Sequence, residues 1–244
     1  MKQSYFEIIT NEPLNASVHK LVLSGDTSEI KKAGQFVNIR LDGRYLRRPI
    51  SVCDYDDGTL TLIYKIVGGG TKQMSLMKPG EKLDILTGLG NGYNTGKSGD
   101  RPLLIGGGVG IPPMYRLAKD LIRDGRQVSV VLGFNTKAES FYTDEFISLG
   151  AKVAVTTVDG SLGKKGFVTD ALPDSYSYFY CCGPEPMLKA VYKATKTSGQ
   201  FSFEERMGCG FGACMGCSCK TLTGYKRICK DGPVMMKEEI LWEA

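Results

Sequence analysis

Apolar and polar residues alternate along several short segments of the first hundred residues. The alternation is clear at residues 17–23, 35–41 and 60–66. A two-residue period places apolar side chains on one face of a strand, as in antiparallel sheets or barrels with one face in water. We therefore expect an antiparallel β-barrel domain over residues 1–97, followed by a glycine-rich linker at its end.

Residues 101–199 follow a different pattern, in which apolar runs alternate with helical stretches. The runs at 102–105, 128–132, 153–157 and 178–182 predict strands, and residues 112–124, 138–149 and 185–197 predict helices. This order is typical of βαβ units on a parallel sheet. We expect an α/β domain over residues 98–200. Residues 201–244 form a third domain, which is too small for a large core and therefore needs a cofactor.

Composition supports this multi-domain organisation and excludes some partners. A chain of 244 residues with 42% hydrophobic residues can bury two ordinary cores and a small appendage. The net charge of +5 includes no long basic run, so a nucleic-acid partner is not expected. The first residues lack the apolar core of a signal peptide, and no apolar stretch approaches the roughly 20 residues that span a bilayer. We expect a cytoplasmic protein without a membrane partner.

Four cysteines follow the spacing of a plant-type [2Fe–2S] site. Cys209, Cys214 and Cys217 are spaced C-x4-C-x2-C, and Cys229 follows twelve residues later. Four thiolates can hold two irons, and the intervening glycines let the backbone direct amides at the sulfurs. Structural zinc is the main alternative, although its usual paired C-x2-C motifs are not evident, and unligated thiols are a third possibility. Cys219 is a fifth candidate ligand, whose simpler interpretation is a buried small hydrophobe.

Two glycine turns follow predicted strands of the α/β domain. The first contains Gly107, Gly108 and Gly110, and the second contains Cys182, Gly183 and Pro184. Glycine lets a phosphate approach backbone amides at a helix N-terminus, where the helix dipole favours an anion. A turn without a ligand also favours glycine, and the first turn is not a G-x-G-x-x-G fingerprint. Two such turns on one sheet nevertheless indicate a dinucleotide site.

A candidate flavin motif lies in the first domain. Arg48, Pro49, Ile50 and Ser51 combine a guanidinium that can clamp a pyrophosphate with groups able to reach flavin edge atoms. Gly70 and Thr71, before a predicted helix at 72–77, offer a second anion site, although a solvated surface arginine is the simpler interpretation of Arg48. The only histidine, His19, is expected at the surface. No catalytic side chain is predicted, which suits chemistry done by cofactors.

The order of these motifs resembles the ferredoxin–NADP reductase superfamily, and most closely the electron-transfer subunits of type-B dihydroorotate dehydrogenase. The resemblance covers nearly the whole chain and includes Asp159-Gly160-Ser161 and Cys229-Lys230-Asp231-Gly232-Pro233. It implies that FAD is held by Arg48 to Ser51, by Ile63, Tyr64 and Lys65, and by Gly70 and Thr71, and that Cys209, Cys214, Cys217 and Cys229 hold the cluster. Superfamily members usually have tyrosine where Ile50 stands, so stacking on the flavin either comes from elsewhere, with Tyr64 as a candidate, or is replaced by an aliphatic contact.

The resemblance also implies a function and a partner. A catalytic subunit would oxidise dihydroorotate at its FMN, and this chain would pass the electrons through [2Fe–2S] and FAD to NAD+, in pyrimidine biosynthesis. The assembly would be a hetero-oligomer, such as a heterotetramer. The face that carries Met207, Phe211 and Met215 would dock the catalytic subunit.

Two other functions remain open from the sequence. One is the small flavin and iron–sulfur subunit of an NAD(P)H:ferredoxin oxidoreductase, and the other is a non-enzymatic binding subunit closed by zinc. The choice between NAD and NADP also stays open, because Asn135-Thr136-Lys137 include neither a clear acid for a ribose hydroxyl nor an arginine for a 2′-phosphate.

Overall fold

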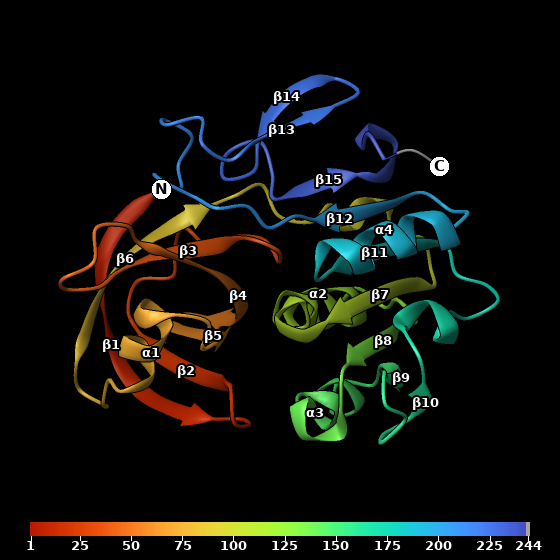
Figure 1. The fold of residues 1–244 in the computed structure, drawn as a ribbon, viewed down its shortest axis with the longest axis horizontal. Coiled ribbons are helices and arrows are strands. Elements are labelled where there is room, and N and C mark those ends of the chain that lie inside the picture. Colours follow the sequence, from red (N-terminus) through yellow and green to blue (C-terminus); the bar gives the residue numbers. More distant parts are fainter. Residues whose placement is uncertain (243–244) are drawn as a thin grey trace.

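The structure is a computed structural model that describes residues 1–242. A barrel and an α/β unit lie side by side, and the C-terminal segment crosses over both of them (Figure 1). Among the helices of residues 1–242, none combines the length and apolar character needed to cross a bilayer.

Six antiparallel strands close the barrel in the order β1-β2-β5-β4-β3-β6. Their alternating apolar residues fill the barrel interior, as the period of two predicts. The helix predicted at 72–77 instead begins three residues earlier, at Gly69. The elements are β1 (Lys2–Pro13), β2 (Val18–Ser24), β3 (Phe36–Arg40), β4 (Arg48–Asp56), β5 (Thr59–Lys65), α1 (Gly69–Ser75) and β6 (Lys82–Leu89).

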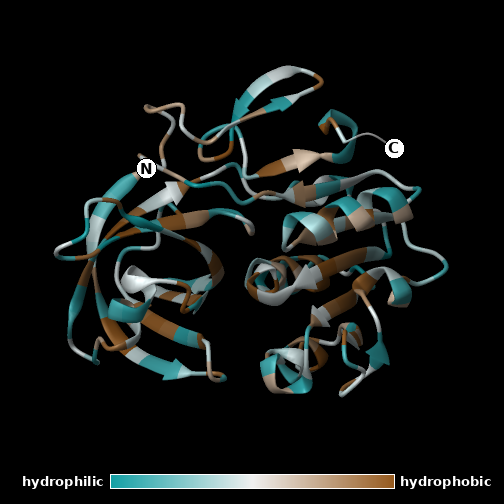
Figure 2. Ribbon diagram, in the orientation of Figure 1, coloured by the Kyte–Doolittle hydropathy of each residue, from teal (hydrophilic) through white to brown (hydrophobic). Residues whose placement is uncertain are grey.

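A seven-stranded sheet forms the α/β unit, in the order β10-β9-β8-β7-β11-β12-β15. Its central strands are apolar on both faces because helices cover them, and Figure 2 shows these strands in brown. The elements are β7 (Pro102–Gly107), α2 (Pro112–Arg123), β8 (Ser129–Phe134), α3 (Thr143–Ser148), β9 (Lys152–Thr157), β10 (Lys164–Lys165), β11 (Tyr178–Cys182), α4 (Glu185–Ala194) and β12 (Gly199–Ser202).

The helix predicted at 138–149 is wrong over its first half. A 3-10 turn at Lys137–Glu139 is followed by extended Ser140, and Tyr142 has φ of +66° before α3 begins at Thr143. Phe141 and Tyr142 are buried at the contact with the barrel. Packing therefore overrides the helical pattern of this segment. The helix predicted at 185–197 also ends earlier, at Ala194.

The C-terminal segment is built into the rest of the molecule. A hairpin of β13 (Ser218–Thr221) and β14 (Gly224–Arg227) is followed by β15 (Val234–Met236), which pairs antiparallel with β12. The predicted boundary between residues 200 and 201 falls inside β12. The division into 1–97, 98–200 and 201–244 therefore remains a prediction, and residues 243–244 of its last part lie outside the described residues.

Candidate functional site

Arg48 lies against the first turn of α1. A Cβ atom at Gly70 would come within 2.2 Å of Arg48 Nε, so only glycine admits the guanidinium there. Arg48 Nη1 donates to the carbonyls of Leu46 (2.6 Å) and Arg47 (3.3 Å), and no carboxylate pairs with Arg48 within residues 1–242. Its charge is therefore free to meet an anion, which fits the pyrophosphate of FAD.

Arg47 has a different environment from its neighbour. It makes a two-pronged pair with Asp84, at 3.0 Å and 3.1 Å, and also donates to the carbonyls of Asn38 and Asp84. Arg47 therefore braces the barrel. Arg44 is nearer to the candidate site than its sequence position indicates, because its Nη2 donates to the carbonyl of Gly69 at 3.1 Å.

The predicted flavin residues on β5 point in different directions. Tyr64 is only 2% exposed and donates its hydroxyl to Asn11 Oδ1 at 3.1 Å, inside the barrel. The prediction that its ring stacks on the flavin is therefore wrong. Ile63 packs on the opposite side, toward the α/β unit, and Lys65 reaches the cleft between the two units.

Thr71 shapes the turn at the start of α1. Its hydroxyl accepts hydrogen bonds from the backbone N–H groups of Val67 (3.0 Å) and Gly68 (3.3 Å) and donates to the carbonyl of Gly68. Thr71 is buried, so its role is to hold the turn against which Arg48 lies. The expectation for His19 also needs correction, because its ring is half-buried and its Nδ1 atom is buried without a partner.

The two glycine turns lie next to each other. β7 and β11 are parallel neighbours, with Gly106 opposite Cys182, so both turns emerge at the carboxyl edge of the sheet. A Cβ atom at Gly110 would come within 2.3 Å of the Cys182 carbonyl oxygen, and one at Gly107 within 2.4 Å of Met187 Sδ. The close packing of the turns accounts for these glycines, and it forms the wall of a cleft.

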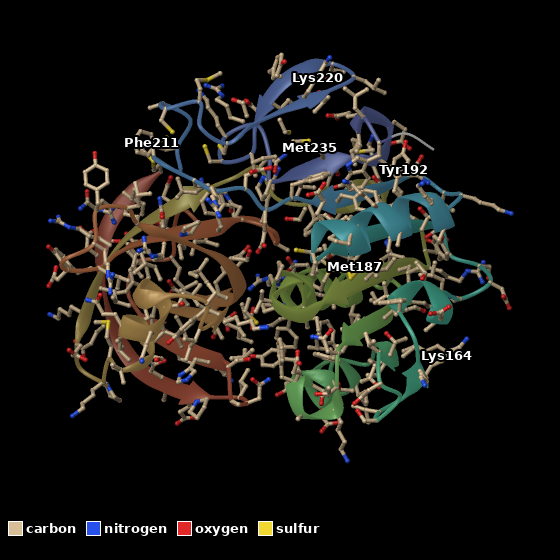
Figure 3. All side chains as sticks on the ribbon, viewed as in Figure 1. Lys164, Met187, Tyr192, Phe211, Lys220 and Met235 are labelled. Atoms are coloured by element: carbon tan, nitrogen blue, oxygen red, sulfur yellow. The ribbon has the colours of Figure 1, made fainter. Side chains whose placement is uncertain are left out.

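This cleft has a volume of about 500 Å³ and opens between the sheet edge and the barrel. Gly107, Gly108, Gly110, Gly183 and Pro184 line it, together with Lys65 from the barrel. An extended dinucleotide fits such a cleft at the carboxyl ends of parallel strands. Figure 3 shows Met187 facing this space from α4.

Several residues of the cleft were missed by sequence analysis. They come from the ends of β8 and β9, from the loop before the 3-10 turn at Val168–Ala171, and from the end of β12. They include Glu139, Thr156, Phe167 and Glu204, and they lie beside Asn135, which the sequence analysis names. The parallel order of β8 and β9 gave a signal for Glu139 and Thr156, because strand ends at one edge of a sheet converge. Glu204 could not be found in this way, because the strand that it follows, β12, was not among the predicted strands.

Cys209 and Cys214 form one pair of thiols. Cys209 Sγ accepts hydrogen bonds from the backbone N–H groups of Phe211, Ala213 and Cys214, at 3.2 to 3.5 Å. Burial alone would raise the pKa of the Cys209 thiol, but these hydrogen bonds lower that pKa to about 6. The loop is therefore built to hold a thiolate, the form that binds iron.

Cys217 and Cys229 form the second pair, in which the Cys229 N–H donates to Cys217 Sγ at 3.4 Å. Both are buried in a small core with Phe36, Leu89 and Met235. Within residues 1–242, no three His, Cys, Asp or Glu side chains gather as a single metal ion would need. Two pairs of thiols fit a cluster of two irons. Cys219, on β13, packs against the same small core but belongs to neither pair.

Comparison with known proteins agrees with this chemistry. Residues 204–241 match the iron–sulfur cluster binding domain of dihydroorotate dehydrogenase B, and residues 104–193 match an oxidoreductase NAD-binding domain. The cluster domain match opposes the zinc-closed binding subunit as an interpretation of the cysteines.

Relatives extend the match over the whole chain. The chain is 43% identical to a dihydroorotate dehydrogenase B (NAD(+)) electron transfer subunit of Geobacillus, covering 99% of both chains. It is also 43% identical to the subunit of that name from Fusobacterium nucleatum, covering 94% of this chain and 95% of that one.

Solved structures share the architecture. The structure of an NADH-dependent reduced ferredoxin-NADP oxidoreductase is 31% identical and superposes with a TM-score of 0.89, covering 98% of this chain and 90% of that one. The cytochrome b5 reductase domain of Ulva prolifera nitrate reductase shares the fold at 18% identity and a TM-score of 0.64, covering 77% and 89%. By its full-length identity to the Geobacillus and Fusobacterium proteins, the chain belongs to the electron transfer subunits of dihydroorotate dehydrogenase B.

Proposed function

We propose that this chain transfers electrons from an FMN-containing dihydroorotate dehydrogenase catalytic subunit to NAD+. FAD and a [2Fe–2S] cluster, when bound, supply the redox chemistry, because a flavin can exchange electrons singly and also deliver a hydride. The remaining work of the chain is to bind these groups, orient them and keep them close together.

The observation that carries the proposal is the position of the cysteine segment. Its small core includes Phe36 and Leu89 of the barrel, and its β15 strand pairs with β12 of the α/β unit. The cysteines therefore adjoin both the barrel with the candidate flavin motif and the sheet with the dinucleotide cleft. Electrons passing between a partner and NAD+ need such a placement.

The individual residue roles are part of the proposal. Arg48 would pair with the FAD pyrophosphate, with Pro49, Ile50 and Ser51 along the flavin edge and Thr71 holding the turn. Gly107, Gly108, Gly110, Cys182, Gly183 and Pro184 would border NAD, and the four paired cysteines would ligate the cluster. The cytoplasm is the proposed location, since NAD+ is available there.

One alternative enzyme role has specific support. The oxidoreductase structure superposes over 98% of this chain, so a partner other than a dihydroorotate-oxidising subunit is compatible with the fold. The higher identity to the dihydroorotate dehydrogenase B subunits favours the proposed partner.

Reconstitution tests the proposal. The purified chain with both cofactors should oxidise NADH with an artificial acceptor but should not oxidise dihydroorotate, because the proposal assigns that oxidation to the FMN of the catalytic subunit. Adding the catalytic subunit from the same organism should produce NADH from dihydroorotate. Dihydroorotate turnover by the chain alone, or a stable complex with no NAD-linked turnover, would refute the proposed function.

A further inference from the structure

Asn38 joins the barrel to the loop that carries the first cysteine pair. It lies on β3, is 1% exposed, and its Nδ2 donates to the carbonyl oxygen of Cys209 at 3.2 Å. Gly210 has φ of +78°, and a Cβ atom there would come within 2.3 Å of Asn38 Nδ2. The loop backbone therefore rests directly on the Asn38 amide.

The same residue is tied to the strand with the candidate flavin motif. Asn38 lies opposite Pro49 in the β3–β4 register, and Arg47 donates to the Asn38 carbonyl oxygen at 3.3 Å. Arg47 is itself fixed by its two contacts with Asp84. Asn38 thus connects β4, the strand with the candidate flavin motif, directly to the backbone of Cys209.

Burial of the Asn38 side chain is unfavourable for stability, which indicates a role other than packing. Its Oδ1 atom is buried and has no hydrogen-bond partner. An unpaired buried acceptor lowers the stability of the folded state. Its neighbours on this face, Phe36 and Leu86, are apolar, so packing alone would favour an apolar residue.

We propose that Asn38 is a positioning residue that fixes the cysteine loop relative to the flavin strand. By anchoring the Cys209 carbonyl, it holds the backbone N–H groups that donate to Cys209 Sγ in place. Hydrogen bonds to cluster sulfurs stabilise the more negative, reduced cluster and so raise its reduction potential. The inference rests on the proposed function in taking these four cysteines as the cluster ligands.

The test compares Asn38→Leu and Asn38→Ala with the unchanged protein, each as the complex with the catalytic subunit. Leucine resembles asparagine in size but cannot donate to the Cys209 carbonyl. FAD and iron contents should stay unchanged, and the midpoint potential of the cluster, measured by EPR titration, should become more negative. Reduction of the cluster through FAD by NADH, followed by stopped flow, should slow by about tenfold or more, while reduction of FAD by NADH stays unchanged.

Asn11→Leu is the matched control. Asn11 is also a barrel asparagine, and its Nδ2 donates to the carbonyls of Met74 and Met77, away from the cysteines. This variant should lower stability without changing the cluster potential. A Gly210→Ala variant, which pushes the loop away from Asn38, should reproduce the shift of the Asn38 variants.

The outcomes separate this inference from the proposed function. If the unchanged protein shows no reducible [2Fe–2S] signal, the proposed function fails. If that signal is present but the Asn38 variants keep its potential and the stopped-flow rate, or match Asn11→Leu, only the positioning role is overturned. Loss of the cluster from both Asn38 variants with FAD retained would also overturn it, since Asn38 would then serve retention of the cluster.

Discussion

At the scale of single residues, neighbouring side chains of one motif have separate tasks. Arg47 is paired with Asp84, whereas Arg48 has only carbonyl partners and lies against the first turn of α1. Arg48→Ala should therefore weaken FAD binding, raising its dissociation constant by about tenfold to a hundredfold because a charge-assisted contact is lost. Flavin fluorescence during titration of apoprotein measures this effect.

The control for that prediction must lie away from α1. Arg44 is unsuitable, because it contacts Gly69 of the same turn. Arg123 is 66% exposed on α2, and Arg123→Ala should leave FAD binding unchanged. If Arg48→Ala keeps the full FAD content and the FAD affinity of the unchanged protein, Arg48 does not bind the FAD pyrophosphate.

The cysteines Cys209 and Cys219 also differ in their surroundings. Cys209 accepts three backbone hydrogen bonds, whereas Cys219 lies on β13 and burial raises the pKa of its thiol. Cys219→Ser should keep the visible absorption of the cluster, and Cys214→Ser should bleach it or make it labile. The reverse pattern in the absorption spectra would mean that the ligand set is wrong.

His19 makes stability depend on pH. Burial lowers its pKa below the ordinary 6.5, so the unfolded chain binds a proton more readily than the folded one. Stability should therefore fall as pH drops through 6.5, and His19→Gln should lessen this fall. Urea unfolding at pH 8 and pH 5.5 measures the free energy of unfolding of both proteins. If this free energy falls equally between the two pH values in the unchanged protein and in His19→Gln, His19 is not the cause of the pH dependence.

At the scale of elements, α2 is fastened to the barrel by Arg116. This side chain is 11% exposed and contacts Asp54 of β4 (3.1 Å), Asp120 of its own helix (3.0 Å) and the ring of Tyr55. Arg116→Ala should destabilise the protein by about 2 kcal/mol, because Asp54 and Asp120 each lose one charged hydrogen bond while keeping Lys119 and Arg123 as partners. Urea unfolding measures this loss of unfolding free energy. The control is Arg123→Ala, at an exposed position, whose unfolding free energy should lie within about 0.5 kcal/mol of that of the unchanged protein.

Most elements were predictable because each follows one period. The barrel strands alternate, and β7, β8 and β11 are largely apolar runs, as burial on both faces requires. The break near Tyr142 was not predictable, since it depends on contacts of Phe141 and Tyr142 with the neighbouring unit. Candidate site residues were found where glycine or cysteine spacing marks them. The inward direction of Tyr64 and the place of Glu204 depend on tertiary packing, which no local pattern encodes.

At the scale of the whole molecule, the region beside the cysteines presents exposed apolar side chains. Phe211 is 44% and Met215 54% exposed, and Figure 3 shows Phe211 on the loop above the barrel. Met207, expected on the same face, instead packs against the small core of Phe36 and Met235. Exposed apolar groups beside a redox centre suit a docking face.

Charge introduced on this face should disrupt the complex. Phe211→Asp should weaken association with the catalytic subunit, while NADH oxidation with an artificial acceptor stays unchanged because Phe211 does not line the dinucleotide cleft. Leu222→Asp, at a similarly exposed position beyond β13, is the control. Analytical ultracentrifugation of the mixed subunits measures association, and equal affinities for both variants would place the docking face elsewhere.

The pairing of β15 with β12 has a consequence for biosynthesis. This edge of the seven-stranded sheet is supplied by Val234–Met236, and Asn91, from the segment after the barrel, accepts from the N–H of Val234 and donates to its carbonyl. All four paired cysteines lie between these two strands in the sequence, so the pairing closes a loop that contains them. Synthesis makes β12 and the cysteines before β15, so this sheet edge is completed only after the cysteine segment has been made. Deletion of Val234–Met236 should therefore leave that segment without its anchor on the sheet and lower the iron content of the purified protein.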